Sequence, residues 1–103
     1  MKSLAELPDG ALIRELGRRL AQRRIHVGLS QAELALRAGI AKRSIERLES
    51  GRPTELKSVL RALRALGCLG GVDGLVPPIA GPARRRVARV RAPPRPPRIG
   101  VRR

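Results

Sequence analysis

Residues 30–51, SQAELALRAGIAKRSIERLESG, decide the fold. Apolar residues recur at helical spacing in residues 31–38 and again in residues 42–50, which predicts two short helices. Gly39 lies between them and supplies the permissive backbone that a tight turn needs. Two short helices joined by such a turn cross steeply, so that the second projects from the surface. The stretch therefore predicts a helix-turn-helix.

The start of each of these helices carries a different signal. Ser30 and Glu33 have the S-x-x-E form of a capping box, in which the serine oxygen and the glutamate carboxylate each accept a hydrogen bond from a free backbone amide. Ala41 precedes the second helix and has no side-chain oxygen to play this part. Because a side-chain cap is typically worth about 1 kcal/mol, we expect the second helix to fray at its start.

Helices are also expected on both sides of the helix-turn-helix. Apolar spacing predicts one helix over residues 9–25, with Asp9 as its N-cap, and another that opens at Thr54 and runs to residue 66. A last turn is expected to cover the bundle with Leu69, Val72 and Leu75. No segment alternates with a period of two, so we expect an all-α, five-helix domain over residues 9–76.

The chain of 103 residues carries 23 Lys and Arg against 8 Asp and Glu, a net charge of +15. Residues 76–103 contain nine of the arginines, no acidic residue and seven of the nine prolines. A segment with this much charge and proline buries too little apolar surface to offset the conformational entropy that it would lose on folding. We expect residues 77–103 to be a disordered basic tail, and the charge as a whole indicates a polyanionic partner.

The second helix of the helix-turn-helix directs cations outward. Lys42, Arg43 and Arg47 fall opposite Ile45 and Leu48, which are expected to face the core. Lysine and arginine at the exposed start of a helix suit the major groove of DNA, where they reach the O6 and N7 acceptors of guanine. The alternative is that these charges form only a solvated helix face.

From Arg19 to Gly67 the chain resembles the phage repressor and Cro-type helix-turn-helix domains of the XRE superfamily. The resemblance rests on RLAQRRIHVGLSQAELALRAGIAKRSIERLESGRP and on the leucine-rich helix that follows and ends in LG. It implies a lambda-repressor-like DNA-binding domain, with base contacts at positions 42, 43 and 47. It also implies a buried ion pair between Arg24 and Glu49. The residues expected to contact phosphate are Arg24, Gln31, Ser44, Ser50 and Arg52.

The function expected from these features is that of a sequence-specific transcriptional regulator, a cytoplasmic, nucleoid-associated dimeric repressor that places residues 42–50 in the major groove of double-stranded DNA. Dimerisation is expected because it is usual in the family that the chain resembles. A narrower version is an autoregulating antitoxin similar to HipB, with a kinase-like toxin as its partner. The alternative is a general nucleic-acid or ribosome-associated protein that binds the phosphate backbone through its arginine tail.

Other function classes find little support in the sequence. A single cysteine, Cys68, and a single histidine, His26, allow neither a disulfide framework nor a zinc site. No nucleophile and base form a catalytic constellation, and no cofactor motif is present. We therefore expect no enzyme, no cofactor, no membrane partner and no small-molecule effector domain.

Overall fold

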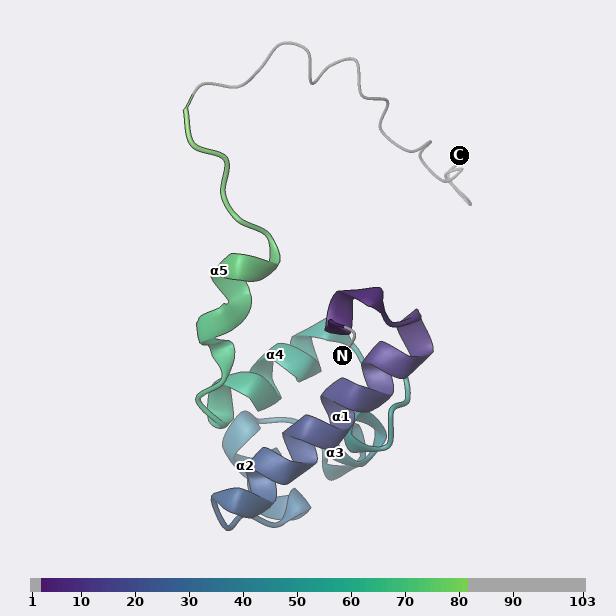
Figure 1. Cartoon of the computed structure of the whole chain (residues 1–103). Helices are drawn as coiled ribbons and strands as arrows, with labels where there is room; N and C mark the ends of the chain where they lie inside the picture. Colours follow the sequence, from purple (N-terminus) through teal and green to yellow (C-terminus); the bar gives the residue numbers. More distant parts are fainter. Residues whose placement is uncertain (1–2, 82–103) are drawn as a thin grey trace, which may run out of the picture.

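The computed structural model describes residues 3–81, and all regular structure in this part of the chain is helical (Figure 1). The elements are η1 (Leu4–Glu6), α1 (Asp9–His26), α2 (Gln31–Ala38), α3 (Lys42–Glu49), α4 (Leu56–Ala65), η2 (Leu69–Gly71) and α5 (Val72–Leu75). The predicted all-α fold with a helix-turn-helix is confirmed. Most of the predicted tail, residues 82–103, lies outside the described residues. No helix within residues 3–81 has the length and apolar character that a membrane crossing needs.

The core is formed mainly by aliphatic side chains where α2 and α3 pack against each other and against α1 and α4. Leu34 of α2 and Ile45 of α3 are fully buried at its centre. Around them are Leu20, Leu29, Ala35, Leu48 and Ala62. Because Ile45 and Leu48 point from α3 into the core, the opposite face of α3 is exposed to solvent.

The turn between α2 and α3 depends on Gly39. Its backbone is left-handed, with φ 71° and ψ 34°, which costs glycine little and other residues more. The Ile40 amide donates to the Ala35 carbonyl oxygen at 3.0 Å, which closes the end of α2. From α4, Nη1 of Arg61 donates to the Gly39 carbonyl oxygen at 3.3 Å. The turn is therefore tied to the fourth helix as well as to its own two helices.

The backbones of α1 and α3 approach each other at Gly17. A Cβ atom at this position would overlap the Leu48 carbonyl oxygen and lie 3.1 Å from the Glu49 carbonyl oxygen. Glycine in a helix interior costs about 1 kcal/mol relative to alanine, yet here it allows a close crossing. Nothing in the local sequence pattern shows which helix Gly17 faces, so this close approach cannot be predicted from the sequence.

The caps of the helix-turn-helix follow their sequence signals. The Ser30 hydroxyl accepts from the Glu33 amide at 3.0 Å, and the Glu33 carboxylate accepts from the Ser30 amide at 2.7 Å. These bonds from the Ser30 backbone and side chain lower the pKa of Glu33. Ala41 provides no side-chain hydrogen bond at the start of α3. At the other end, α3 stops one residue earlier than predicted, with Ser50 as its C-cap.

Two predicted N-caps are wrong by one residue. Pro8 caps α1 in place of Asp9, which is the first helical residue and places its carboxylate in the first turn. Glu55 caps α4 in place of Thr54. The Thr54 hydroxyl donates to the carbonyl oxygen of Arg52, two residues earlier, at 3.0 Å and does not cap α4.

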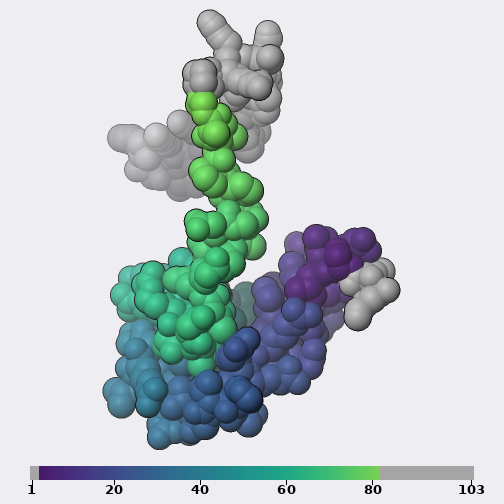
Figure 2. All heavy atoms as spheres, turned by 60° about the vertical axis from the view of Figure 1, so that its left-hand side comes forward, coloured from purple at the N-terminus to yellow at the C-terminus, as the bar shows by residue number. Residues whose placement is uncertain are grey.

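The prediction that α5 covers the bundle is wrong. Figures 1 and 2 show α5 standing away from α1, at the end of a segment that rises from α4. The cause is local, since Gly71 and Val72 keep helical backbone angles and the chain runs from η2 into α5 without reversing. As a result Leu75 is 75% exposed.

Candidate nucleic-acid interface

Helix α3 has one buried face and one cationic face. Ile45 and Leu48 are 0% and 6% exposed and fix the helix on the body of the domain. Lys42, Arg43 and Arg47 are all exposed, as the sequence predicts. A helix held on one side and cationic on the other can enter the major groove without unfolding any part of the core.

Four of the predicted contact residues gather around one hollow. Arg43, Arg47, Ser50 and Arg52 line it together with Glu46, in a volume of about 560 Å³ next to the exposed face of α3. Three guanidinium groups and a single carboxylate make this hollow cationic. Arginine binds both phosphate oxygens and the guanine edge in a bidentate manner, so the hollow suits a nucleic acid.

Within the hollow, Arg47 and Ser50 already make internal hydrogen bonds. Nη2 of Arg47 donates to the Pro53 carbonyl oxygen at 3.0 Å and holds the loop after α3. The Ser50 hydroxyl donates to the Arg47 carbonyl oxygen at 3.0 Å. Arg47 keeps other N–H groups for a ligand, whereas Ser50 would have to give up its internal bond to donate to a phosphate.

At the start of α3, Lys42 and Glu46 form an ion pair of 3.6 Å with both side chains about half exposed. Surface pairs of this kind contribute about 0–1 kcal/mol, so Lys42 can exchange its partner for a DNA acceptor at little cost. Ser44 is partly buried in the first turn, where its amide donates to the Ala41 carbonyl oxygen at 2.9 Å.

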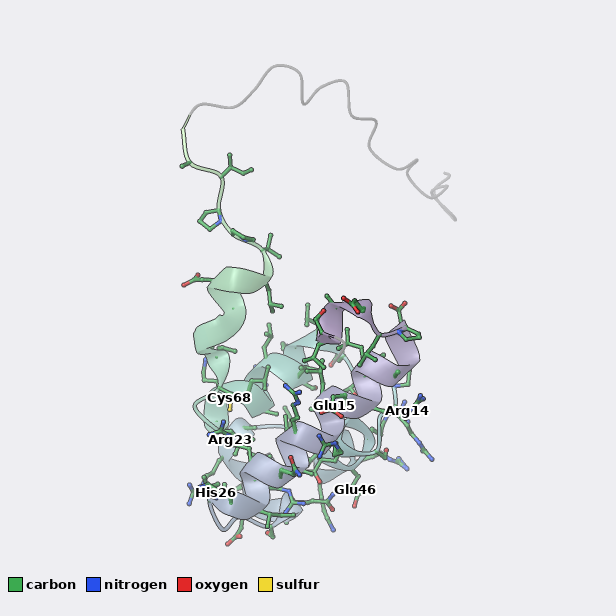
Figure 3. The ribbon with its side chains drawn as sticks, in the orientation of Figure 1. Arg14, Glu15, Arg23, His26, Glu46 and Cys68 are labelled. Atoms are coloured by element: carbon green, nitrogen blue, oxygen red, sulfur yellow. The ribbon has the colours of Figure 1, made fainter. Side chains whose placement is uncertain are left out.

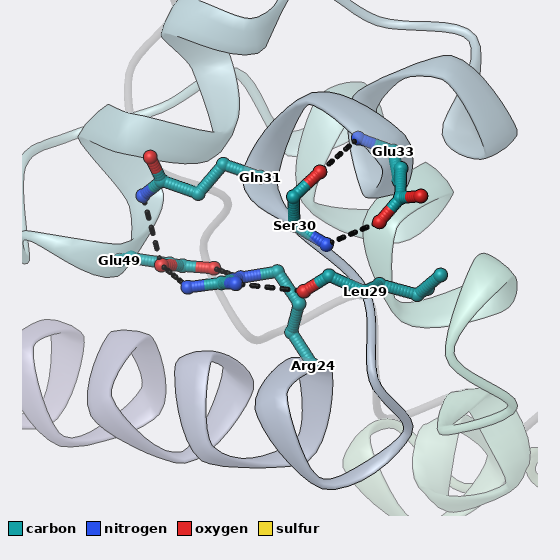
Figure 4. A network of polar contacts seen from close by, with 6 residues as sticks. All are labelled: Arg24, Leu29, Ser30, Gln31, Glu33 and Glu49. Carbon is teal, nitrogen blue, oxygen red and sulfur yellow. Dashed lines mark hydrogen bonds and ion pairs between the residues drawn. The ribbon is translucent and has the colours of Figure 1, made fainter.

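A polar network joins the first three helices behind α3 (Figure 4). Nε and Nη2 of Arg24 donate to the two carboxylate oxygens of Glu49 at 2.6 and 2.9 Å. Nη1 of Arg24 donates to the Leu29 carbonyl oxygen at 2.8 Å, and Nε2 of Gln31 donates to Glu49 at 3.0 Å. The Arg24 and Glu49 side chains are only 12% and 8% exposed. One carboxylate thus fixes α1, α2 and α3 relative to one another.

This network uses polar groups of two residues that are also expected to contact phosphate. The bond to Glu49 raises the pKa of the Arg24 guanidinium, and three of its nitrogens donate inside the protein. Arg24 therefore holds the helices together, and the phosphate contact expected of it stays a prediction. Gln31 uses one of its two amide N–H groups on Glu49, which leaves the other for a ligand beside α3.

An all-helical domain in which α2 and α3 meet at a left-handed glycine, with a cationic outer face on α3, is a helix-turn-helix DNA-binding protein. A profile of a helix-turn-helix domain family matches residues 15–73, more than half of the chain, and the chain belongs to this family. Members of such families are typically not enzymes. No curated protein matches the chain.

Proposed function

We propose that this protein is a sequence-specific transcriptional regulator that inserts α3 into the major groove of double-stranded DNA. The observation that carries the proposal is the division of α3 into a buried face at Ile45 and Leu48 and an exposed face of cations. Lys42, Arg43 and Arg47 are the proposed base contacts. Arg43 is the strongest of the three, since it lies in the first turn and opens onto the cationic hollow.

The proposed phosphate contacts surround these base contacts. Arg52 shares the hollow with Arg43, while Gln31 is the first residue of α2 and keeps one free amide N–H. Ser44 lies in the first turn of α3. Phosphate contacts fix the register of a protein on the duplex without reading its sequence, and this is the role we assign to these residues.

We further propose that the regulator acts as a dimeric repressor at the nucleoid in the cytoplasm. Two copies place their α3 helices about one DNA turn apart, roughly 34 Å, and read two half-sites. A promoter occupied in this way is closed to polymerase. The narrower antitoxin function requires a kinase-like toxin encoded beside this chain, and co-purification with that neighbour tests it.

The proposal is tested by binding to a labelled duplex from the upstream region of the protein's own gene, against a scrambled duplex at roughly physiological salt. The label is placed on the DNA because the chain has neither Trp nor Tyr. A preference of about 10³ or more is the expected result for specific recognition. Equal affinities that fall together as salt rises would favour the alternative, backbone binding through the nine arginines of residues 76–103.

A further inference from the structure

An apolar groove runs between α1 and α4, on the side of the domain that α5 leaves uncovered. It has a volume of about 400 Å³ and is lined chiefly by Ile13, Leu16, Leu20, Val59, Leu63 and Leu66. Leu16 remains 48% exposed although it lines this groove. A groove of this size and character accommodates several aliphatic side chains.

The charged residues of the groove are all cationic. Arg19, Arg23 and Arg52 line it, and no acidic residue does so among the described residues. Figure 3 shows Arg23 of α1 near Cys68, which lines the end of the groove where α4 has finished. Arg19 is already bonded to Glu15 at 2.8 Å, so Arg23 is the better candidate to meet a new partner. The groove therefore suits a segment that is apolar and carries a carboxylate.

Such a segment exists in the chain itself. Residues 69–79, here called the arm, rise clear of the body in Figure 2. Leu75, Val76 and Ile79 are 75%, 82% and 83% exposed along it. Asp73 is the single acidic residue of the arm. The arm thus matches the groove in both apolar character and charge.

The arm is poorly placed to enter the groove of its own chain. Cys68 already lies at one end of the groove, and the next residues form η2, in which the Val72 amide donates to the Leu69 carbonyl oxygen. Entry into its own groove would require the chain to reverse at Gly70 and Gly71 and to break this turn. A second copy can offer its arm without any such change.

We propose that two copies of this chain exchange arms, each arm filling the groove between α1 and α4 of the other copy. Asp73 of each arm then meets Arg23 of the partner copy, and Leu75 and Val76 enter the apolar floor. The exchange is reciprocal, as a two-fold interface demands, and leaves α3 of both copies exposed. This proposal rests on the dimer of the proposed function and specifies how it is built.

The first test is sedimentation equilibrium of the full chain without DNA. The wild-type protein is expected to dimerise, and Asp73→Arg is expected to raise the dimer dissociation constant about tenfold or more by placing like charges together. Adding Arg23→Asp to Asp73→Arg should restore dimerisation. Glu6→Arg, an exposed change of equal charge outside the arm and groove, serves as the control for overall repulsion. A monomeric wild-type protein, or a dimer indifferent to Asp73→Arg, would overturn the proposal.

The second test identifies what each arm touches, with Cys68→Ser as the background and oxidised glutathione as the oxidant. A chain with Leu16→Cys mixed with a chain with Leu75→Cys should give a disulfide-linked heterodimer. A disulfide that forms only between two Leu75→Cys chains would mean that the arms pair with each other. A chain that carries both Leu16→Cys and Leu75→Cys tests whether the arm folds back, because an arm that does so would give a disulfide within that chain. Either result contradicts arm exchange. Since no DNA is present, failure here is distinct from failure of the proposed DNA binding.

Discussion

At the scale of single residues, Glu49 has the largest expected effect on stability. It accepts hydrogen bonds from Arg24 and Gln31 while its side chain is only 8% exposed. Breaking a buried ion pair strands the remaining charge and typically costs about 3–5 kcal/mol. We expect Glu49→Ala to lower the free energy of unfolding by an amount in this range, measured by urea denaturation followed by circular dichroism.

The matched control is Glu46, which lies nearly one helical turn earlier in α3. Glu46→Ala also removes a glutamate from this helix, but its partner Lys42 is 3.6 Å distant and both side chains are about half exposed. The expected change is below about 1 kcal/mol. Equal losses for the two variants would contradict the positioning role of the Arg24–Glu49 pair.

Replacing Arg43 should weaken DNA binding and leave the stability of the fold unchanged. Arg43 is exposed in the first turn of α3. If it contacts guanine in a bidentate manner, Arg43→Ala should cost about 1–3 kcal/mol on the specific duplex and relax sequence preference. The measurement is a titration of specific and scrambled duplexes, with Arg64→Ala, an exposed arginine of α4, as the control. An equal loss on both duplexes would make Arg43 a phosphate contact.

At the scale of elements, the crossing of α1 and α3 depends on Gly17. Alanine raises helix propensity by about 1 kcal/mol, but its Cβ would overlap the Leu48 carbonyl oxygen. Such overpacking typically costs about 1–3 kcal/mol, so Gly17→Ala should lower the melting temperature. Gly10→Ala is the control in the same helix, because its Cβ would meet only the Arg14 side chain at 3.5 Å. A Gly17→Ala protein as stable as wild type would contradict the close crossing.

Helix α1 should also show a charge effect at low pH. Glu15 accepts from Nη2 of Arg18 at 2.6 Å and from Nε of Arg19 at 2.8 Å, and these bonds lower its pKa from 4.5 to about 2. A carboxyl group with a lowered pKa stabilises the fold above its unfolded pKa, and this contribution is lost as pH falls through the folded value. Glu15→Gln should therefore melt below wild type near neutral pH, and the difference should shrink as the pH falls from 4.5 towards about 2. Thermal melts across this range test it; a difference independent of pH would contradict it.

The elements that local sequence signals specify could be predicted well. The helix-turn-helix has its own cap at Ser30, its own turn at Gly39 and apolar spacing on both helices, so its bounds agree with the sequence within a residue. The N-caps predicted at Asp9 and Thr54 are each misplaced by one residue. The observed caps, Pro8 and Glu55, make no side-chain cap hydrogen bond, so the capping preference of a side chain does not decide where these helices begin.

Features that depend on contacts between two distant segments of the chain are harder to predict from the sequence. The resemblance to a known family implied the pairing of Arg24 with Glu49, but not the further bonds to Leu29 and Gln31 that complete the network. The apolar residues Leu69, Val72 and Leu75 predict a last turn that covers the bundle, but Val72 and Leu75 are exposed. Composition alone, however, does not show the direction in which a chain leaves a helix.

At the scale of the whole molecule, the two regions of positive charge should contribute differently to binding. Deleting residues 82–103 removes nine arginines and leaves α3 and the arm intact. If these arginines bind phosphates, affinity for all duplexes should fall while sequence preference remains. The salt dependence should also flatten, by about 0.9 for each phosphate that the deleted arginines neutralise. Fluorescence anisotropy titrations at several salt concentrations give both quantities. An unchanged slope would assign the deleted segment to another partner.

The residues that hold α3 in place are different from the residues that are proposed to contact the DNA bases. The placement of α3 is set from behind, by the close backbone approach at Gly17, the buried side chains Ile45 and Leu48, and the carboxylate of Glu49. None of these atoms belongs to Lys42 or Arg43, and exposed substitutions usually change stability by no more than about 0.5 kcal/mol. Such a scaffold can acquire a new operator through a few outward substitutions, without a new fold, and duplicated copies of this gene could diverge in target while remaining equally stable.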